Sequence, residues 1–322
     1  MHVRLIDGNS VGYAQHHAND VRLLHGVPMQ AVDGFARHMR KWRQSEQETL
    51  HVVLWDGRAQ WRYDLAPEYK SGRQRTEEQR RTRREYEAQR PPIHRLLRAM
   101  PVIQVTHPWM EADDLSFALS VELSAQGHLV DMFTADHDWL QNVRNRVGWM
   151  NARNRDMVVN ETNFRKLTGC ANPRAFVEVK ALMGDVSDDL AGAPGIKDVR
   201  ARELIEKYGS LAAFWRASED AFFEGPKHLM QATLPEVRAL IERNLKLMDL
   251  SLAPVPDVSL ANIEIGEFVD IELYDALDDY GMESVCDAFE LFVRPLRREL
   301  TKEQTSSFRR AVLNMGRSYQ AR

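Results

Sequence analysis

The chain has 322 residues, 43% of them hydrophobic and 28% charged, with a formal net charge of −4 at pH 7. These values are typical of a soluble globular protein, and the length suits two domains or one domain with a large extension. Two cysteines argue against a disulfide framework or a zinc site. The N-terminus lacks the apolar core of a signal peptide, and no stretch approaches the about 20 apolar residues of a membrane span. We therefore expect a cytoplasmic protein with no membrane partner.

The first 56 residues predict a strand, a helix and a second strand. Val3–Ile6 is short and apolar, and the turn signal Asp7-Gly8-Asn9-Ser10 follows it. Apolar residues from Met29 to Gln44 come close to helical spacing. His51–Trp55 is the second apolar run, and Asp56 follows it directly.

Arginine dominates residues 58–98, and almost no apolar side chain lies between Thr76 and Arg90 except Tyr86 and Ala88. A helix this polar cannot bury a face in a core, so it is either solvated or able to bind a polyanion. We expect residues 74–90 to become ordered when such a polyanion binds.

Beyond residue 100, Pro101–Val105, Leu129–Phe133 and Val147–Met150 predict strands, and Ala112–Ala125 predicts a helix. Strands that alternate with helices favour an α/β fold with a mostly parallel sheet. After about residue 160 the pattern is helical, apart from an irregular stretch at 254–272. We therefore expect an α/β domain at 1–160 that includes the basic segment 58–98, a helical region at 161–295, and a basic C-terminal tail at 296–322.

Acidic residues recur where predicted strands end or helices begin. The carboxyl ends of parallel strands meet at one edge of a sheet, so these side chains should lie together. Crowded carboxylates need a counter-charge, and Mg²⁺ or Mn²⁺ is the natural one. Two such ions about 3.5–4 Å apart are the working parts of a phosphodiester nuclease. The candidate ligands are Asp7, Asp56, Glu111, Asp113, Asp114, Asp136, Asp138, Asp185 and Asp188.

Each acidic group has a structural explanation when it is taken alone. Asp7 and Asp136 could cap a turn or a helix, and acids at 111–114 could favour a helix dipole. The loop from Asp185 to Ile196 is more specific, since it has acids at its start and a Pro-Gly turn into a helix. It looks like the hairpin of a helix-hairpin-helix element, which holds a DNA phosphate by backbone N–H groups, or it is an ordinary helix connection.

Together these residues resemble the 5′-nuclease superfamily, the flap endonucleases and 5′→3′ exonucleases. The matching segments follow the family's order over residues 1 to about 210. They are Leu5-Ile-Asp7-Gly-Asn, Trp55-Asp56-Gly, Tyr69-Lys70-Ser-Gly-Arg73, Glu111-Ala-Asp113-Asp114, Asp136-His-Asp138 and Gly184-Asp185-Val-Ser-Asp188-Asp189-Leu-Ala-Gly-Ala-Pro-Gly195-Ile. The resemblance implies a PIN-like sheet with a helical arch over 58–98 and a helix-hairpin-helix near 184–208. It also implies a divalent-metal phosphodiesterase that acts at DNA 5′ ends, flaps or RNA primers.

The same resemblance assigns roles to residues. Five acids match those nearest a first metal ion: Asp7, Asp56, Glu111, Asp113 and Asp136. Four match those around a second: Asp114, Asp138, Asp185 and Asp188. Lys70 and Arg73 match the catalytic basic pair at the start of the arch. The hairpin at 190–196 matches one that often binds K⁺ in relatives. The expected DNA contacts are Tyr69, Arg80, Arg81, Arg84, Gly195, Ile196, Lys197 and Arg200.

Three positions depart from the family pattern. Asp189 stands where Asn is usual, Lys197 replaces the second glycine of the hairpin, and Val199 replaces a common lysine. A left-handed backbone would make Lys197 costly, so the hairpin geometry and the K⁺ site depend on that residue. No polymerase domain follows the matched segments, and we expect a stand-alone, monomeric enzyme of the phage or accessory bacterial type. The rival interpretations are a ribonuclease on the same fold and a non-catalytic DNA-junction binding protein.

Overall fold

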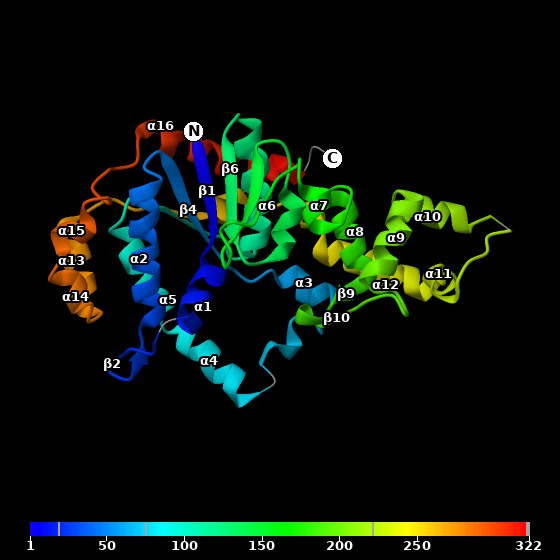
Figure 1. Cartoon of the computed structure of the whole chain (residues 1–322), viewed down its shortest axis with the longest axis horizontal. Coiled ribbons are helices and arrows are strands. Elements are labelled where there is room, and N and C mark those ends of the chain that lie inside the picture. Colours follow the sequence, from blue (N-terminus) through cyan, green and yellow to red (C-terminus); the bar gives the residue numbers. More distant parts are fainter. Residues whose placement is uncertain (19, 75, 221, 320–322) are drawn as a thin grey trace.

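The computed structural model describes residues 1–18, 20–74, 76–220 and 222–319, without the side chains of residues 73, 74, 318 and 319. A seven-stranded sheet forms the centre of the molecule, and helices lie on both of its faces (Figure 1). A smaller group of helices, α9 to α11, extends from one end (Figure 1). In these described ranges, no helix has the length and apolar character needed to cross a membrane.

Five strands of the sheet run parallel, and an antiparallel strand closes each edge. The strand order is β11-β5-β4-β1-β6-β7-β8. The parallel strands are β1 (His2–Asp7), β4 (Thr49–Trp55), β5 (Ile103–Thr106), β6 (Leu129–Thr134) and β7 (Val147–Asn151), and the edge strands are β8 (Val158–Val159) and β11 (Asn262–Ile265). The predicted fold class, a mostly parallel sheet flanked by helices, is therefore confirmed.

Side chains alternate across each strand, so the sheet supplies two separate cores. Leu5 and Val52 face one core, together with helices α6 (Ala112–Ala125) and α16 (Lys302–Asn314). Ile6 and Val53 face the other, which contains residues of α2 (Gln30–Ser45), α5 (Arg90–Arg98) and α13 (Asp270–Asp279). The central strands are buried on both faces, which explains why they read as continuous apolar runs.

Two local predictions were wrong. The signal at residues 7–10 opens helix α1 (Gly8–Ala18) instead of a turn, because the Asp7 carboxylate accepts the Ser10 N–H at 2.8 Å and so caps the first turn. Gly8 allows this helix to lie against β4, since a Cβ there would come within 2.7 Å of the Trp55 ring. The stretch predicted to be irregular at 254–272 contains β11, which pairs with β5 at the edge of the sheet.

The basic segment 58–98 forms helices α3 (Gln60–Leu65), α4 (Glu77–Glu87) and α5, with a short 3₁₀ turn (Ser71–Gln74) between α3 and α4. A small hairpin of β2 (Leu23–Leu24) and β3 (Val27–Pro28) lies between α1 and α2. After the sheet, helices dominate as predicted: α7 (Phe164–Thr168), α8 (Pro173–Met183), α9 (Asp198–Tyr208), α10 (Leu211–Ser218), α11 (Lys227–Ala232) and α12 (Pro235–Met248). A short hairpin of β9 (Gly184–Asp185) and β10 (Leu190–Ala191) precedes α9.

The C-terminal helices return to the sheet. Helices α13, α14 (Glu283–Cys286) and α15 (Phe289–Val293) pack with α2 and α5. The segment expected as a basic tail contains α16, whose Phe308, Ala311 and Val312 are buried in the core shared with α6. Its basic residues lie on the opposite, solvated face, so α16 is an amphipathic part of the fold.

This packing makes a prediction about stability. Replacing the fully buried Phe308 by alanine should lower the free energy of unfolding by about 3–5 kcal/mol, because it removes apolar contacts and leaves a cavity. Leu313 is on the same helix but 69% exposed, so Leu313→Ala should change stability by less than about 0.5 kcal/mol. Urea titration of both variants tests this, and equal effects would show that α16 is not docked on α6.

Candidate active site

A cavity of about 630 Å³ lies where β1, β4 and β6 reach their carboxyl ends. Parallel strands point their carboxyl ends to one edge, so residues remote in sequence meet there. Seven of the nine predicted metal-ligating acids line this acidic cavity: Asp7, Asp56, Asp113, Asp136, Asp138, Asp185 and Asp188. The structure therefore brings these seven predicted ligands together. Asp198, which was not predicted, also lines the cavity, whereas Glu111 and Asp114 do not line it.

Asp7 and Asp56 lie at the ends of neighbouring strands. The Asp7 carboxylate accepts hydrogen bonds from the Ser10 N–H and the Thr134 hydroxyl, both at 2.8 Å. Burial, and then the charge of Asp56, raise the pKa of Asp7 to about 7. Asp56 accepts the Ala112 N–H at 2.8 Å, which ties the end of β4 to the first turn of α6.

Asp113 and Asp136 bring further negative charge to the same place. The Asp113 carboxylate accepts a hydrogen bond from the indole N–H of Trp139 at 2.7 Å, and this bond fixes the orientation of the carboxylate. Burial, and then Asp136, raise the pKa of Asp113 well above its usual value. Burial and Asp138 raise the pKa of Asp136 to about 6. These shifts are the electrostatic signature of carboxylates that share one space.

Lys180 is a functional residue that the sequence reasoning missed. Its ammonium forms ion pairs with Asp138 and with Asp185, the latter at 3.2 Å. Burial opposes ionisation of Asp185, yet Lys180 and Ser187 together hold its pKa below the usual value. Lys180 lies near the end of α8, five residues before Asp185. This nearness in the sequence was the only indication that the two side chains could pair.

Glu111 caps α6 and lies between the acidic cavity and the start of the basic segment. Its carboxylate accepts hydrogen bonds from Lys70 Nζ at 2.7 Å and from the Tyr69 hydroxyl at 3.0 Å. Burial would raise its pKa, but Lys70 and Arg62 hold the pKa of Glu111 below the usual value. Lys70 lines the acidic cavity. Its backbone is left-handed, with φ of 57°, which is uncommon for lysine and persists only where the surrounding structure holds it. The ion pair with Glu111 is one such contact.

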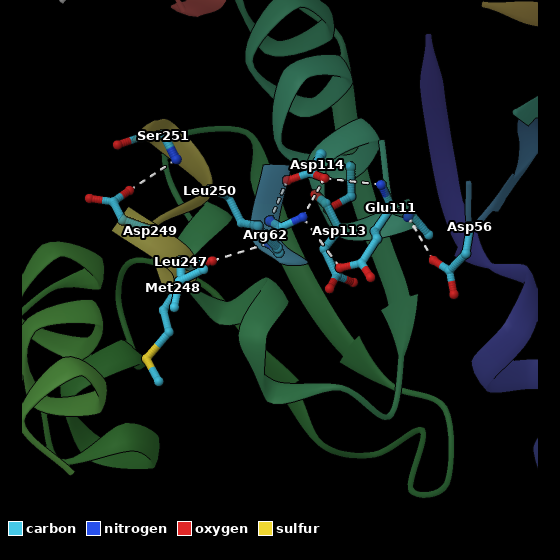
Figure 2. Close-up of polar contacts among 12 residues, drawn as sticks. Asp56, Arg62, Glu111, Asp113, Asp114, Leu247, Met248, Asp249, Leu250 and Ser251 are labelled. Carbon is cyan, nitrogen blue, oxygen red and sulfur yellow. Dashed lines mark hydrogen bonds and ion pairs between the residues drawn. The ribbon is translucent and has the colours of Figure 1, made fainter. Parts of the chain in front are cut away.

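Asp114 departs from the prediction, because it faces the protein interior. Its carboxylate accepts two hydrogen bonds from Arg62, at 2.6 and 2.8 Å, and caps the Glu111 N–H at 3.0 Å. Figure 2 shows the Arg62 guanidinium between Asp114 and the carbonyl of Leu247, to which it donates at 3.2 Å. Asp114 therefore holds α6, α3 and the end of α12 together. Nothing in the sequence marked Arg62 among the other arginines as its partner.

Tyr69 also departs from its predicted role. Its ring is buried against Ala66, Leu190, Leu247 and Met248, so it cannot stack on a base. Burial, and then Glu111, raise its pKa, and its hydroxyl remains a donor to Glu111. Arg73 lies in the 3₁₀ turn after Lys70, but its side chain is outside the described part of the chain.

Helix α4 flanks a second cavity of about 1180 Å³ that continues from the acidic one. We call it the α1–α4 groove; it is lined by Tyr13 and His17 from α1 and by Gln79, Arg83 and Tyr86 from α4. Buried Tyr86 anchors the last turn of α4 against Tyr13, with ring centroids 5.4 Å apart. The surface arginines pair locally, Arg80 and Arg84 with Glu77, and Arg81 with Glu85.

The segment predicted as the hairpin, 190–196, contains a turn at Pro194-Gly195. Gly195 has a left-handed backbone, with φ of 74°, and leads into α9. Lys197 has φ of −116°, an ordinary extended conformation, so the missing glycine causes no strain. The Ile196 N–H donates to the Ala193 carbonyl at 3.1 Å and its side chain is buried, so Ile196 is not the free phosphate donor that was predicted. Arg200 donates to the Gly195 carbonyl at 2.7 Å.

Comparison with known proteins identifies the family. The profile of the family described as 5′-3′ exonuclease, N-terminal resolvase-like domain, matches residues 2–169, which is more than half of the chain. The chain belongs to this family. The match covers all five parallel strands and every acid of the cavity except Asp185, Asp188 and Asp198.

Relatives are found among bacterial proteins of two lengths. The chain is 28% identical to the thermostable DNA polymerase I of Thermus thermophilus over 252 residues, which is 78% of this chain but 29% of the polymerase. It is 26% identical to the 5′-3′ exonuclease of Mycoplasma pneumoniae over 303 residues, which is 88% of this chain and 97% of that protein. The chain thus spans less than a third of the polymerase and nearly all of the exonuclease.

Solved structures confirm the fold over most of the chain. A bacteriophage T5 protein co-crystallised with metal ions aligns with a TM-score of 0.68 at 21% identity, covering 87% of this chain and all of that one. The catalytic core of Rad2 in complex with DNA substrate aligns with a TM-score of 0.58 at 17% identity, covering 92% of each chain. The helices after residue 160 therefore belong to the same architecture as the sheet.

The pairing of Arg62 with Asp114 predicts a specific mutational pattern. Arg62→Met should lower the free energy of unfolding by about 3–5 kcal/mol, because it leaves the Asp114 carboxylate buried without a counter-charge. Adding Asp114→Asn should recover much of that loss, since the amide is neutral and still accepts the Glu111 N–H. Chemical denaturation of the two variants measures this, and a double variant less stable than the single one would contradict the assignment.

The raised pKa of Asp7 predicts how stability depends on pH. The folded state holds this proton up to about pH 7, whereas the unfolded value is 3.8. The unfolding free energy of the metal-free protein should therefore fall as pH rises from about 4 to 7. Asp7→Asn should reduce this fall and should make the protein more stable than wild type at pH 8, by roughly 1–3 kcal/mol. Denaturation in EDTA at several pH values measures this. Identical pH profiles for wild type and Asp7→Asn would contradict the raised pKa of Asp7.

Proposed function

We propose that this chain is a divalent-metal-dependent, structure-specific 5′ nuclease, with 5′→3′ exonuclease and flap endonuclease activity on DNA. The observation that carries the proposal is the acidic cavity, which eight aspartates line and in which the pKa values of Asp7 and Asp136 are raised. Such crowding of negative charge favours a bound cation. Membership of the exonuclease family supports the activity, and neighbours solved with DNA or metal ions support the substrate and the cofactor.

The donor set of the cavity consists of carboxylate oxygens, which fits Mg²⁺ or Mn²⁺. Among the described residues, no three or more His, Cys, Asp or Glu side chains form a group that could hold an ion unaided. Mg²⁺ keeps several waters and is often held by one or two carboxylates together with substrate phosphates, so it does not require such a group. We assign a first site to Asp7, Asp56, Glu111, Asp113 and Asp136, and a second to Asp138, Asp185 and Asp188.

When bound, the metal ions would supply an activated water and would offset the charge on the transferring phosphate. The chain itself supplies Lys70, whose ammonium is held at the edge of the cavity by Glu111. A preorganised cation at this place stabilises negative charge that grows in the transition state. We assign Arg73, which follows in the same turn, as the second cation of this pair.

The α1–α4 groove gives the 5′ strand a route to the acidic cavity. Arg80, Arg81 and Arg84 on α4 are paired with glutamates at the surface. Surface ion pairs of this kind contribute only about 0–1 kcal/mol, so DNA phosphates can compete for these arginines. The hairpin supplies a second grip, in which Gly195, Lys197 and Arg200 contact the duplex backbone. Arg200 already donates to the Gly195 carbonyl, so K⁺ would have to compete with it there.

The relatives suggest the biological setting. The bacterial proteins that this chain resembles include a DNA polymerase I and a 5′-3′ exonuclease. We infer that it removes RNA primers or degrades DNA 5′ ends during replication, repair or recombination, as a monomer in the cytoplasm of a bacterial or phage-infected cell. RNA in an RNA–DNA hybrid is then a second substrate of the same site.

A non-catalytic junction binder is the rival from a different class. Eight carboxylates in one cavity would repel DNA phosphates unless cations bind between them, so a binder gains nothing from keeping them. End-labelled 5′-flap and blunt duplex DNA, incubated with Mg²⁺ or with EDTA, separates the two functions. Cleavage of the flap that requires Mg²⁺ supports the nuclease, whereas binding without cleavage supports the rival.

The acids make a quantitative prediction for this assay. Asp136→Asn should lower the cleavage rate more than about 100-fold, because a neutral amide is a weaker partner for a divalent cation, while duplex binding changes little. Asp275→Asn is a matched control, since Asp275 is exposed on α13 outside the acidic cavity. It should leave the rate unchanged. Near-normal cleavage by Asp136→Asn in Mg²⁺ would remove the basis of the proposal.

A further inference from the structure

Arg153 is the cation at the junction of the two cavities. It lines both the acidic cavity and the α1–α4 groove, together with Asn9, Ser10, Asp56, Asp136 and Ser187. Lys70, Lys180 and Arg202 line only the acidic cavity, and Arg83 and Arg90 line only the groove. Among the described residues, Arg153 is thus the one lysine or arginine that borders both spaces. A strand that passes from the groove to the acids crosses the junction that this side chain lines.

The charge of Arg153 is uncommitted, unlike that of the other cations in the acidic cavity. Lys70 pairs with Glu111 at 2.7 Å, Lys180 with Asp185 at 3.2 Å, and Arg202 with Asp198 at 2.8 Å. The Arg153 side chain is exposed, and within the described ranges its guanidinium forms no hydrogen bond, ion pair or ring contact. An exposed guanidinium without a partner in the described part of the chain, beside so many carboxylates, is available to bind an anionic ligand.

The backbone that carries Arg153 is held in place. The Asn151 side chain accepts the Arg153 N–H at 2.8 Å and the Asn154 N–H at 3.1 Å. The Ala152 N–H donates to the Thr134 carbonyl at 3.0 Å, which joins this turn to β6. Thr134 also donates to Asp7. The turn after β7 is therefore connected to the acid cluster by short bonds, and only the Arg153 side chain is free to adjust.

The geometry points to Arg153 as a substrate-contacting residue that binds a phosphate of the cleaved strand next to the scissile bond, and so places that bond over the acids. This inference rests on the proposed nuclease function. A guanidinium suits the role because its planar donors bind two phosphate oxygens at once. Lys70 acts from the α3 side of the cavity, whereas Arg153 acts from the β7–β8 turn, so the two residues hold the strand from different elements.

Arg153→Ala should lower the single-turnover rate on a 5′ flap about 10- to 100-fold at saturating enzyme, the size of effect expected when one hydrogen bond to a charged phosphate is lost. Arg153→Lys should be intermediate, because it keeps the charge without the bidentate geometry. Arg309→Ala is the matched control, since it removes an exposed arginine from α16, outside both cavities. It should leave the rate unchanged, and all three variants should unfold at the wild-type temperature.

A phosphate-specific readout separates contact from a structural role. Flap substrates are made with one neutral methylphosphonate at successive linkages around the scissile bond. At one linkage, the methylphosphonate should lower the cleavage rate of wild type by about the same factor as the Arg153→Ala substitution does. At that linkage it should not lower the rate of Arg153→Ala any further. If the two losses multiply at every linkage, Arg153 contacts no phosphate there and the inference is overturned.

Binding provides a test that does not depend on cleavage. In EDTA, the slope of log affinity against log salt for flap DNA should be smaller by about one for Arg153→Ala than for wild type. An unchanged slope overturns the inference even if the rate falls. Failure of wild type to cleave any flap in Mg²⁺ would instead overturn the proposed function, and the change in salt dependence would then still decide whether Arg153 binds phosphate.

Discussion

Repulsion among the carboxylates at the edge of the sheet is the constraint on which the rest of the structure depends. Eight aspartates line one cavity, and the pKa values of three of them, Asp7, Asp113 and Asp136, are raised. The fold offsets part of this cost with donors from its own chain. Backbone N–H groups of Ser10 and Ala112 contact two of the acids, and the remaining charge favours cations from outside.

The basic residues divide into those that build the site and those that lie exposed in surface ion pairs. Arg62 is buried and holds Asp114, and Lys70 is bound to Glu111, so the beginning of the basic segment is locked to the first turn of α6. Helix α4 is different, because its arginines form exposed pairs that contribute little to stability. The basic segment 58–98 is therefore fixed beside the acids at its start. On α4, next to the groove, its arginines can exchange their partners.

The loop between α8 and α9 links the acids to the predicted duplex contact. Its first part brings Asp185 and Asp188 to the cavity, and its second part makes the turn at Gly195 into α9. The β9–β10 hairpin joins the two parts over only a few residues. A duplex held at α9 would thus be kept at a fixed distance from the acids, which explains how a protein that reads no base could select a position along a strand.

The sequence by itself determined the parallel sheet and the acid cluster. Apolar runs that end in acids specify buried parallel strands, and the carboxyl ends of such strands must meet, so Asp7, Asp56 and Asp136 could be grouped without coordinates. The helix Ala112–Ala125 was predicted to the residue because its apolar periodicity and first-turn residues agree. Local patterns carry this information.

Only the tertiary structure decided which charge meets which. Arg62 and Arg80 look alike in the sequence, yet one is buried on Asp114 and the other is solvated, because burial depends on how α3 docks against α6 and α12. Long-range packing likewise buries Tyr69 in the interior. It also buries one face of α16, whose apolar residues lie next to basic ones in the sequence. Side-chain partners are set by long-range packing, and for this reason the positions of Lys180 and Arg153 at the cavity emerged only with the fold.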